Sequence, residues 1–320
     1  MHAARRPILS HPRQRGFTLV ELLVTITLGL LVIAGIGQIY SAAKHSYDIQ
    51  SSLARLQDTG RYAVDAITQD VRRAGYWGLT NMRAAAPNGA VAPNGTCATG
   101  DTTWGSMVTE GIFGFNDGNG YACITNRLAN SGDILAVRYA DPNPATATAA
   151  AIAAAPQRLY IRTAPAPIQT NLAQGNPAGG AAAIFSDHAV IAHAYYVRNF
   201  SGSISCAGSV PELVQVSLDG NGQPARQGLV LGVERLQFQF GIDINGDRSV
   251  NQYVNANAVA VAVGNWNNVV SVRFWILVRD ECPEAGYVNN NTYVMGDVPN
   301  FQPNDNYRRQ LFTSTVALRN

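Results

Sequence analysis

Oxygen-bearing side chains at alternate positions in one short stretch are typical of calcium-binding loops. Asp243, Asn245 and Asp247 stand two residues apart, as do the first ligands of an EF-hand loop. Two positions depart from that pattern, since Arg248 replaces the sixth-position glycine and Val254 the twelfth-position glutamate. The pattern leaves two alternatives, a calcium site with Asp243, Asn245 and Asp247 as ligands, or a polar turn that joins two strands.

Recognisable catalytic motifs are missing from the sequence. It has no G-x-S-x-G, no H-E-x-x-H and no phosphate-binding glycine loop. His188 and His193 lie five residues apart, which puts them on opposite faces of a strand, so they cannot share a metal ion. We therefore expect a protein that is not an enzyme and has no cofactor, calcium excepted.

One apolar segment near the N-terminus is long enough to cross a membrane. Residues 22–43 carry no charged side chain, and as a helix these 22 positions would extend about 33 Å. Arginines precede the segment, so the positive-inside rule places residues 1–16 in the cytoplasm and the rest outside. A cleavable secretory signal that ends near Ala43 is the alternative. The length of the segment and Glu21 at its start argue against that alternative.

The four cysteines, Cys97, Cys123, Cys206 and Cys282, all follow the apolar segment. None of them forms a C-x-x-C pair, which disfavours zinc. An even number of cysteines on one side of a membrane anchor favours two disulfide bonds in an oxidising compartment. Three pairings are open, and Cys97–Cys123 with Cys206–Cys282 keeps each pair within one half of the chain. The alternative is four buried free thiols.

The start of the apolar segment resembles the leader of type IV pilins and type II secretion pseudopilins. The stretch 15–24 reads RGFTLVELLV, with a basic residue, Gly, Phe and Glu before the apolar run. The resemblance implies that a prepilin peptidase cleaves between Gly16 and Phe17, removes residues 1–16, and leaves an amine on Phe17 that is methylated. It also implies that Glu21 pairs with this ammonium group on a neighbouring subunit, which offsets the cost of burying both charges.

A helical pattern continues beyond the apolar segment. Apolar residues recur on one face at spacings close to 3.6; they are Leu53, Leu56, Ala63, Ile67 and Val71. The pattern ends at a Gly-containing stretch after Ala74. We therefore expect one stem helix from Phe17 to about Ala74. Residues 17–43 would form its transmembrane or filament-core half, and residues 44–75 an amphipathic half that packs on a sheet.

Residues 76–320 are expected to form a β-rich globular head with long loops, giving an α+β fold with an antiparallel sheet packed on the stem. Period-two alternation and β-branched residues predict the strands, which are 134–139, 159–162, 189–198, 213–218, 229–242, 269–278 and 311–318. The stretches 145–155 and 164–183 are rich in Ala, Pro and Gly and are interpreted as loops.

Several further stretches resemble the PilW group of minor pilins. They read LQDTGRYA at 56–63, RRAGY at 72–76, GVERLQF at 232–238, VRFWI at 272–276 and RRQLFTSTVALRN at 308–320. The resemblance covers the stem and about residues 230–320, whereas residues 80–228 match no family that we recognise.

These features predict a minor pilin of the type IV pilus of a Gram-negative bacterium. The resemblance implies an inner-membrane protein whose head lies in the periplasm and later at the pilus tip, in a complex that primes assembly and supports motility or adhesion. Its partners would be other minor pilins and the major pilin through the stem helix, the prepilin peptidase and the assembly platform. After Gly75 there are 14 Arg and 16 acidic residues, so a basic patch for nucleic acid is not expected.

Two other functions remain open at this point. A J-type minor pseudopilin at the tip of a type II secretion pseudopilus would share the same layout, and neighbouring genes would separate the two machines. A membrane-anchored periplasmic enzyme would need a catalytic constellation on the head.

Overall fold

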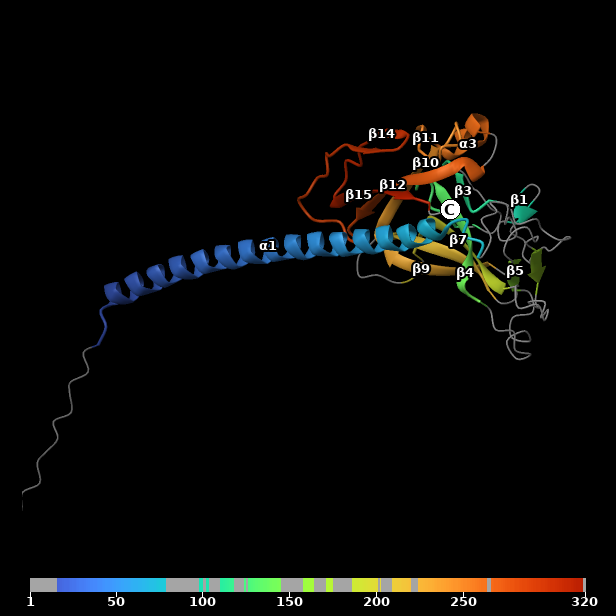
Figure 1. Ribbon diagram of the computed structural model, residues 1–320. Helices are drawn as coiled ribbons and strands as arrows, with labels where there is room; N and C mark the ends of the chain where they lie inside the picture. Colours follow the sequence, from blue (N-terminus) through green and yellow to red (C-terminus); the bar gives the residue numbers. More distant parts are fainter. Residues whose placement is uncertain are drawn as a thin grey trace, which may run out of the picture. The chain divides into compact units, whose positions relative to one another are not determined.

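The protein has a long N-terminal helix and a β-rich remainder, which confirms the predicted α+β class (Figure 1). The chain divides into two compact units, Met1–Leu53 and Ala54–Asn320. The computed structural model describes residues 16–78, 98–99, 102–103, 110–117, 124, 126–144, 158–163, 171–174, 186–200, 202, 209–219, 224–263 and 266–318.

Helix α1 spans Leu19–Arg73 and confirms the predicted stem helix. A capping box forms its first turn, in which a hydroxyl residue and a Glu three positions later satisfy free backbone groups. The N–H of Glu21 donates to the Thr18 hydroxyl at 3.3 Å, and that hydroxyl lies 3.4 Å from the Glu21 carboxylate. Glu21 therefore helps to begin the helix, besides any role between subunits.

The end of α1 is set by Gly75. Its φ of 73° lies in the left-handed region, where a glycine commonly ends a helix. The Gly75 N–H donates to the Arg138 carbonyl at 2.9 Å, and Arg138 lies on strand β4 (Ile134–Pro144). The turn thus joins the helix end directly to a sheet.

Residues 54–73 of α1 pack on the sheets through one apolar face. Leu56, Ala63, Ile67 and Val71 are at most 2% exposed, as the helical spacing predicted. Leu53 is 41% exposed, so its assignment to the buried face was wrong. Leu53 is the last residue of the first unit and precedes the part of the helix that packs in the core.

A large antiparallel sheet is organised around the long strand β7 (Ser186–Asn199), which pairs with β4, β5 and β8. The other strands are β3 (Ile112–Phe115), β5 (Leu159–Thr163), β6 (Asn171–Gln174), β8 (Pro211–Leu218) and β9 (Pro224–Leu231). The predicted strands 134–139, 159–162, 189–198 and 213–218 all lie in this sheet. Strand β6 falls within 164–183, so the loop interpretation was wrong there, and residues 145–155 lie outside the described residues.

A second antiparallel sheet has the strand order β11-β10-β12-β15. Its strands are β10 (Val233–Ile242), β11 (Gln252–Val254), β12 (Val269–Arg279) and β15 (Arg309–Ala317). The predicted single strand 229–242 is in fact β9 and β10, because the chain leaves one sheet and enters the other at Gly232. The φ of Gly232 is 91°, and a Cβ at this position would lie 2.7 Å from the Arg279 carbonyl oxygen, so only glycine fits.

Smaller elements that the sequence did not predict complete the described part of the chain. They are β1 (Ala98–Thr99), β2 (Thr102–Thr103), helix α3 (Ala256–Val263), the 3₁₀ turn η1 (Trp266–Asn268), β13 (Tyr293–Met295) and β14 (Val298–Phe301). β13 and β14 form an antiparallel hairpin, called the β13–β14 hairpin below.

The two sheets and residues 54–73 of α1 share one hydrophobic core. Tyr195 and Val197 of β7 belong to this core together with Phe238 of β10 and Phe274 of β12, and all four are at most 1% exposed. The sheets are also joined through the backbone, since Gly132 and Leu236 form a parallel bridge. Residues 54–73 of α1 are therefore part of the fold of the head.

Candidate functional site

The predicted cleavage position lies at the start of α1. Phe17 is 83% exposed, and a Cβ on Gly16 would meet nothing within 4 Å. Packing of this chain therefore does not require glycine at position 16. Cleavage between Gly16 and Phe17 stays a prediction.

The N-terminal part of α1 exposes a continuous apolar surface. Leu19, Leu31 and Ile39 are 74%, 70% and 72% exposed, and Leu22 and Leu23 are 55% exposed. The helix is long and apolar enough to cross a membrane. So large an apolar surface is not stable in water and needs lipid or other apolar helices around it.

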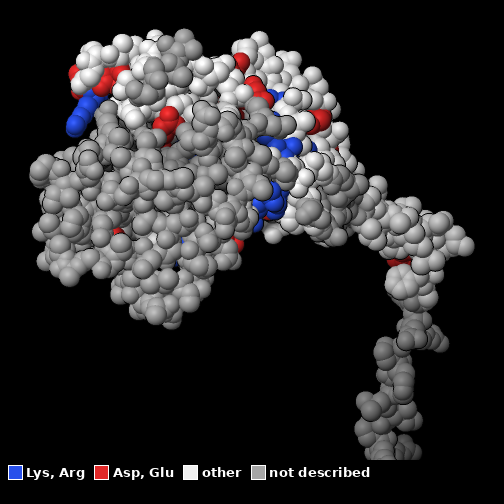
Figure 2. Space-filling model, turned by 90° about the vertical axis from the view of Figure 1, so that its right-hand side faces the viewer, with Lys and Arg blue, Asp and Glu red and all other residues white. Residues whose placement is uncertain are grey.

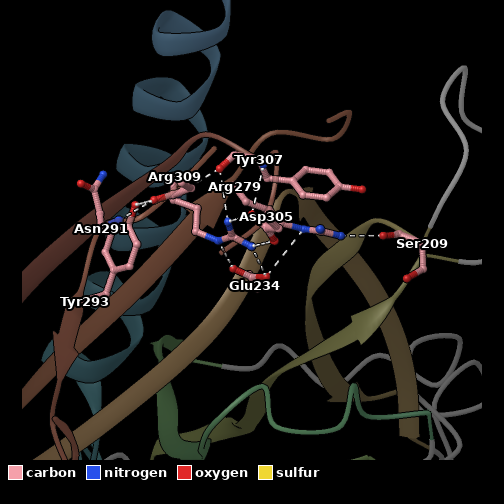
Figure 3. A network of polar contacts seen from close by, with 9 residues as sticks. Ser209, Glu234, Arg279, Asn291, Tyr293, Asp305, Tyr307 and Arg309 are labelled. Carbon is pink, nitrogen blue, oxygen red and sulfur yellow. Dashed lines mark hydrogen bonds and ion pairs between the residues drawn. The ribbon is translucent and has the colours of Figure 1, made fainter. Parts of the chain in front are cut away.

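Two of the stretches that resemble PilW meet at a buried ion-pair network (Figure 3). Arg309 of β15 donates through Nε and Nη2 to the two carboxylate oxygens of Glu234 on β10, at 2.6 and 2.9 Å. It also donates through Nη1 and Nη2 to both oxygens of Asp305, at 2.5 and 2.7 Å. The Arg309 side chain is 1% exposed, so this network fixes β15 to β10 across the intervening β12.

Arg279 extends the network from β12 to the segment before β8. Its Nη2 donates to the Ser209 carbonyl at 2.6 Å, and its Nε lies 3.9 Å from Glu234 Oε1. Its guanidinium also stacks 4.1 Å from the centre of the Tyr307 ring. The network therefore holds four separate segments of the chain together.

The charges of this network stabilise one another. Burial opposes ionisation of Asp305, but hydrogen bonds from Arg309 and from the Tyr307 N–H outweigh it and hold the pKa of Asp305 below its usual value. Burial likewise disfavours the Arg309 cation, yet the bonds to Asp305 and Glu234 raise the pKa of Arg309. Asp305 and Arg309 therefore stay charged at neutral pH, and the arrangement acts as a structural clamp.

A second buried network joins α1 to the sheet around β7, and the sequence did not reveal it. Asp70 is 6% exposed and accepts hydrogen bonds from the hydroxyls of Tyr139 at 2.8 Å and Tyr195 at 2.5 Å. His193 Nδ1 lies 2.5 Å from the same carboxylate, and Gln215 donates to the Tyr195 hydroxyl at 2.7 Å. The position of Asp70 beside the apolar face of α1 was the available signal, because a buried acid needs partners.

The loop predicted to bind calcium follows β10 and folds around Asp243. The two Asp243 carboxylate oxygens accept N–H groups of Gly246 at 2.7 Å and Arg248 at 2.8 Å. Asn245 donates to Asp247 at 3.0 Å. Within the described residues, no three His, Cys, Asp or Glu side chains are placed to hold a metal ion. Calcium at Asp243, Asn245 and Asp247 stays a prediction beside the alternative of a polar turn.

Of the four cysteines, the structure describes Cys282, which is not a free thiol. Cys97, Cys123 and Cys206 lie outside the described residues. Arg279 lies three residues before Cys282, and Ser209 lies three residues after Cys206. The hydrogen bond between Arg279 and Ser209 therefore brings the neighbourhoods of these two cysteines together. This contact favours the Cys206–Cys282 pairing among the three that the sequence leaves open.

We therefore expect peptide mapping without reduction to find one peptide pair that contains Cys206 and Cys282. Cys282→Ser should lower the free energy of unfolding by about 2–4 kcal/mol, as is usual for a native disulfide. A Cys282 linked to Cys97 or Cys123 would contradict this pairing, and two free thiols at 206 and 282 would contradict the bond itself.

The charged side chains on the face shown in Figure 2 are of both signs and are scattered among uncharged atoms. Several described acids and arginines are paired, such as Arg198 with Glu212 at 2.8 Å and Arg308 with Glu284. On this face, the described residues therefore do not form one large basic surface.

Known protein families match two parts of the chain, one near the N-terminus and one in the C-terminal region. Residues 11–37 match the prokaryotic N-terminal methylation motif, and together with the exposed apolar helix this motif defines a type IV pilin-like protein. Residues 194–320 match the type IV pilus-assembly protein W, PilW. These matches support a type IV pilin-like minor pilin and confirm the resemblance to the PilW group. No curated protein and no solved structure gives a match.

The methylation motif implies a substrate of prepilin peptidase within a pilus assembly system. The apolar α1 and this motif fit a pilin anchored in a membrane. The pilin family suggests a structural protein.

Proposed function

We propose that this chain is a minor pilin of the complex that primes type IV pilus assembly and stays at the pilus tip. The observation that carries the proposal is one chain with a methylation motif, an exposed apolar α1 and a PilW-type C-terminal region. Before assembly, α1 would anchor the chain in the inner membrane with the head in the periplasm. The head would thus support motility or adhesion without catalysing a reaction.

The assembly step rests on packing between stems. The exposed apolar residues of α1 would lose their lipid contacts and pack on the stems of other minor pilins and of the major pilin. After cleavage between Gly16 and Phe17, the ammonium of Phe17 and the Glu21 carboxylate of a neighbouring stem would both be in an apolar environment. Each charge needs the other there, so the pair would set the axial register between subunits.

The test compares Glu21→Leu with Glu21→Gln in the source bacterium. Gln keeps a side-chain oxygen for the Thr18 hydroxyl but has no charge, whereas Leu keeps only the backbone N–H contact with Thr18. We expect both variants to reduce pili per cell, counted by electron microscopy, by at least about tenfold, since 1.4 kcal/mol of lost association energy already corresponds to that factor. Mass spectrometry of the mature N-terminus at Phe17 checks that cleavage is unaffected.

Each outcome of this test separates the alternatives. Loss of pili in Glu21→Leu with normal pili in Glu21→Gln would assign Glu21 to helix capping and refute the charge pair. Normal pili in a strain that lacks the gene would refute the proposed function. Lost protein secretion with normal pili in that strain would identify a type II secretion pseudopilin instead.

A further inference from the structure

A buried carboxylate, Asp133, lies where the two sheets of the head meet. It is 2% exposed and directly follows Gly132, which bridges to Leu236. Its Oδ2 accepts the Phe238 N–H at 2.7 Å, and its Oδ1 accepts the Asp117 N–H at 3.1 Å. Asp133 therefore contacts both β10 and the segment that follows β3.

One amide links Asp133 to the β13–β14 hairpin. With its nitrogen turned toward the carboxylates, Gln237 donates to Asp133 Oδ2 at 3.1 Å and to Asp297 Oδ1 at 3.0 Å. Asp297 lies in the turn of the hairpin, where its Oδ2 accepts from Asn116 at 2.9 Å and from Asn255 at 3.0 Å. Two carboxylates thus face each other across a single buried side chain.

The hairpin covers apolar side chains of the second sheet. Met295 and Leu277 are 0% exposed, and they form a small cluster with Tyr293 and the partly buried Trp275. Gly296 lies directly on the Trp275 indole, since a Cβ there would be 3.5 Å from the ring. If the hairpin moved outward, these apolar side chains would meet water.

The charges around Asp133 disfavour its ionised form. Burial, followed by the nearby charges of Asp297 and Asp117, raises the pKa of Asp133 to about 7 against the opposing backbone hydrogen bonds. Two cations lie near this site. Arg127 interacts with Asp133 and Asp117, and its Nη2 already donates to the Gly132 carbonyl. Arg235 of β10 interacts with Asp117 and lies 3.9 Å from the centre of the Phe301 ring of the hairpin. Gln237 of β10 is the uncharged side chain between Asp133 and Asp297, and the uncharged Asn116 and Asn255 bind Asp297.

We infer that Asp133 is a proton-controlled switch for the β13–β14 hairpin. With Asp133 protonated, the hairpin packs on β12 and covers Leu277 and Met295. With Asp133 ionised, repulsion from Asp297 moves the hairpin outward, because the hairpin is a surface element whereas Asp133 is fixed between two sheets. The head then presents an apolar patch in mildly alkaline surroundings that it hides in acidic ones. This inference does not depend on the proposed pilus function.

Hydrogen–deuterium exchange of the full chain in detergent measures the hairpin directly. Rates for peptides over 290–303 are recorded at pH 5.5 and pH 8.5, corrected for intrinsic exchange and compared with peptides over β12. We expect the hairpin to open severalfold more at pH 8.5, because outward movement relieves the part of the pKa shift that comes from Asp297 while Asp133 stays buried between the sheets. Equal corrected opening at both pH values overturns the inference.

Three variants test whether Asp133 is the titrating group. Asp133→Asn should abolish the pH dependence, and an unchanged dependence in a folded Asp133→Asn overturns the inference. Asp297→Asn removes the repelling charge, so it should reduce the pH dependence of hairpin opening severalfold. This variant is the test of the inference if Asp133→Asn does not fold. An unchanged pH dependence in Asp297→Asn again overturns the inference. Asp58→Asn, at an exposed position of α1 outside this site, is the matched control and should behave as wild type.

Discussion

Arg309→Met should lower the free energy of unfolding by about 3–5 kcal/mol, because it removes one member of a buried ion-pair network. Arg309 is 1% exposed and binds two carboxylates in bidentate fashion. Without it, Glu234 and Asp305 face each other with only the more distant Arg279 as a cation. Thermal unfolding followed by circular dichroism should show a Tm about 10 °C lower for a head of this size.

The neighbouring arginine supplies the control. Arg308 pairs with Glu284, but its side chain is 19% exposed and that of Glu284 is 24% exposed. Arg308→Met should therefore cost only about 1 kcal/mol, as for other solvent-accessible ion pairs. Equal decreases in Tm in the two variants would show that the buried ion pairs of Arg309 stabilise the fold no more than the solvent-accessible pair of Arg308. Arg309→Lys should fail to restore stability, since a lysine cannot make two bidentate contacts.

Asp70→Asn should lower the free energy of unfolding at neutral pH by about 2–3 kcal/mol, because hydrogen bonds to a charged group are lost between α1 and the sheet. Burial opposes ionisation of Asp70, but contacts with His193, Tyr195 and Tyr139 outweigh it and lower the pKa of Asp70. The folded-state pKa is thus below the unfolded value of 3.8. The stabilisation is therefore present above about pH 4 and is lost as the pH falls through the folded-state pKa.

Urea unfolding between pH 2.5 and 7 checks this sign. The wild type should lose stability below about pH 4, and Asp70→Asn should lose less over the same range. Asp65→Asn is the matched control, because Asp65 is an exposed acid on the same helix whose hydrogen bond is to Gln69. If the free energy of unfolding falls as steeply with decreasing pH in Asp70→Asn as in the wild type, Asp70 is not the source of the acid sensitivity.

The sequence predicted the features that depend on local periodicity. The apolar run and the spacing of Leu56, Ala63, Ile67 and Val71 gave the helix, because a helical face needs only residues within a few turns. Alternation likewise predicted most long strands. The alternation did not predict the break at Gly232, where the chain crosses from one sheet to the other. The glycine inside the alternating stretch was the available signal, because such a glycine often marks an irregularity in a strand.

The networks depend on non-local contacts and could not be predicted. Glu234 and Arg309 both lie in stretches that resemble PilW, yet nothing in either stretch shows that they pair across β12. Asp70 and His193 come from a helix and a strand whose relative register is set by the whole core. The helix α3 has alternating small and β-branched residues, a strand-like pattern that tertiary packing overrides.

The contact between Gly60 and Phe312 has a consequence for how the protein is made. A Cβ on Gly60 would overlap the Phe312 ring, so the last strand of the chain packs on the stem at a glycine that leaves room for it. These two residues lie near opposite ends of the polypeptide, and β15 completes its sheet on β12. Contacts of such high sequence separation form late and slowly. The second sheet can therefore be completed only after β15 has been synthesised, and a chain that stops before β15 would leave the core beside Gly60 open to proteases.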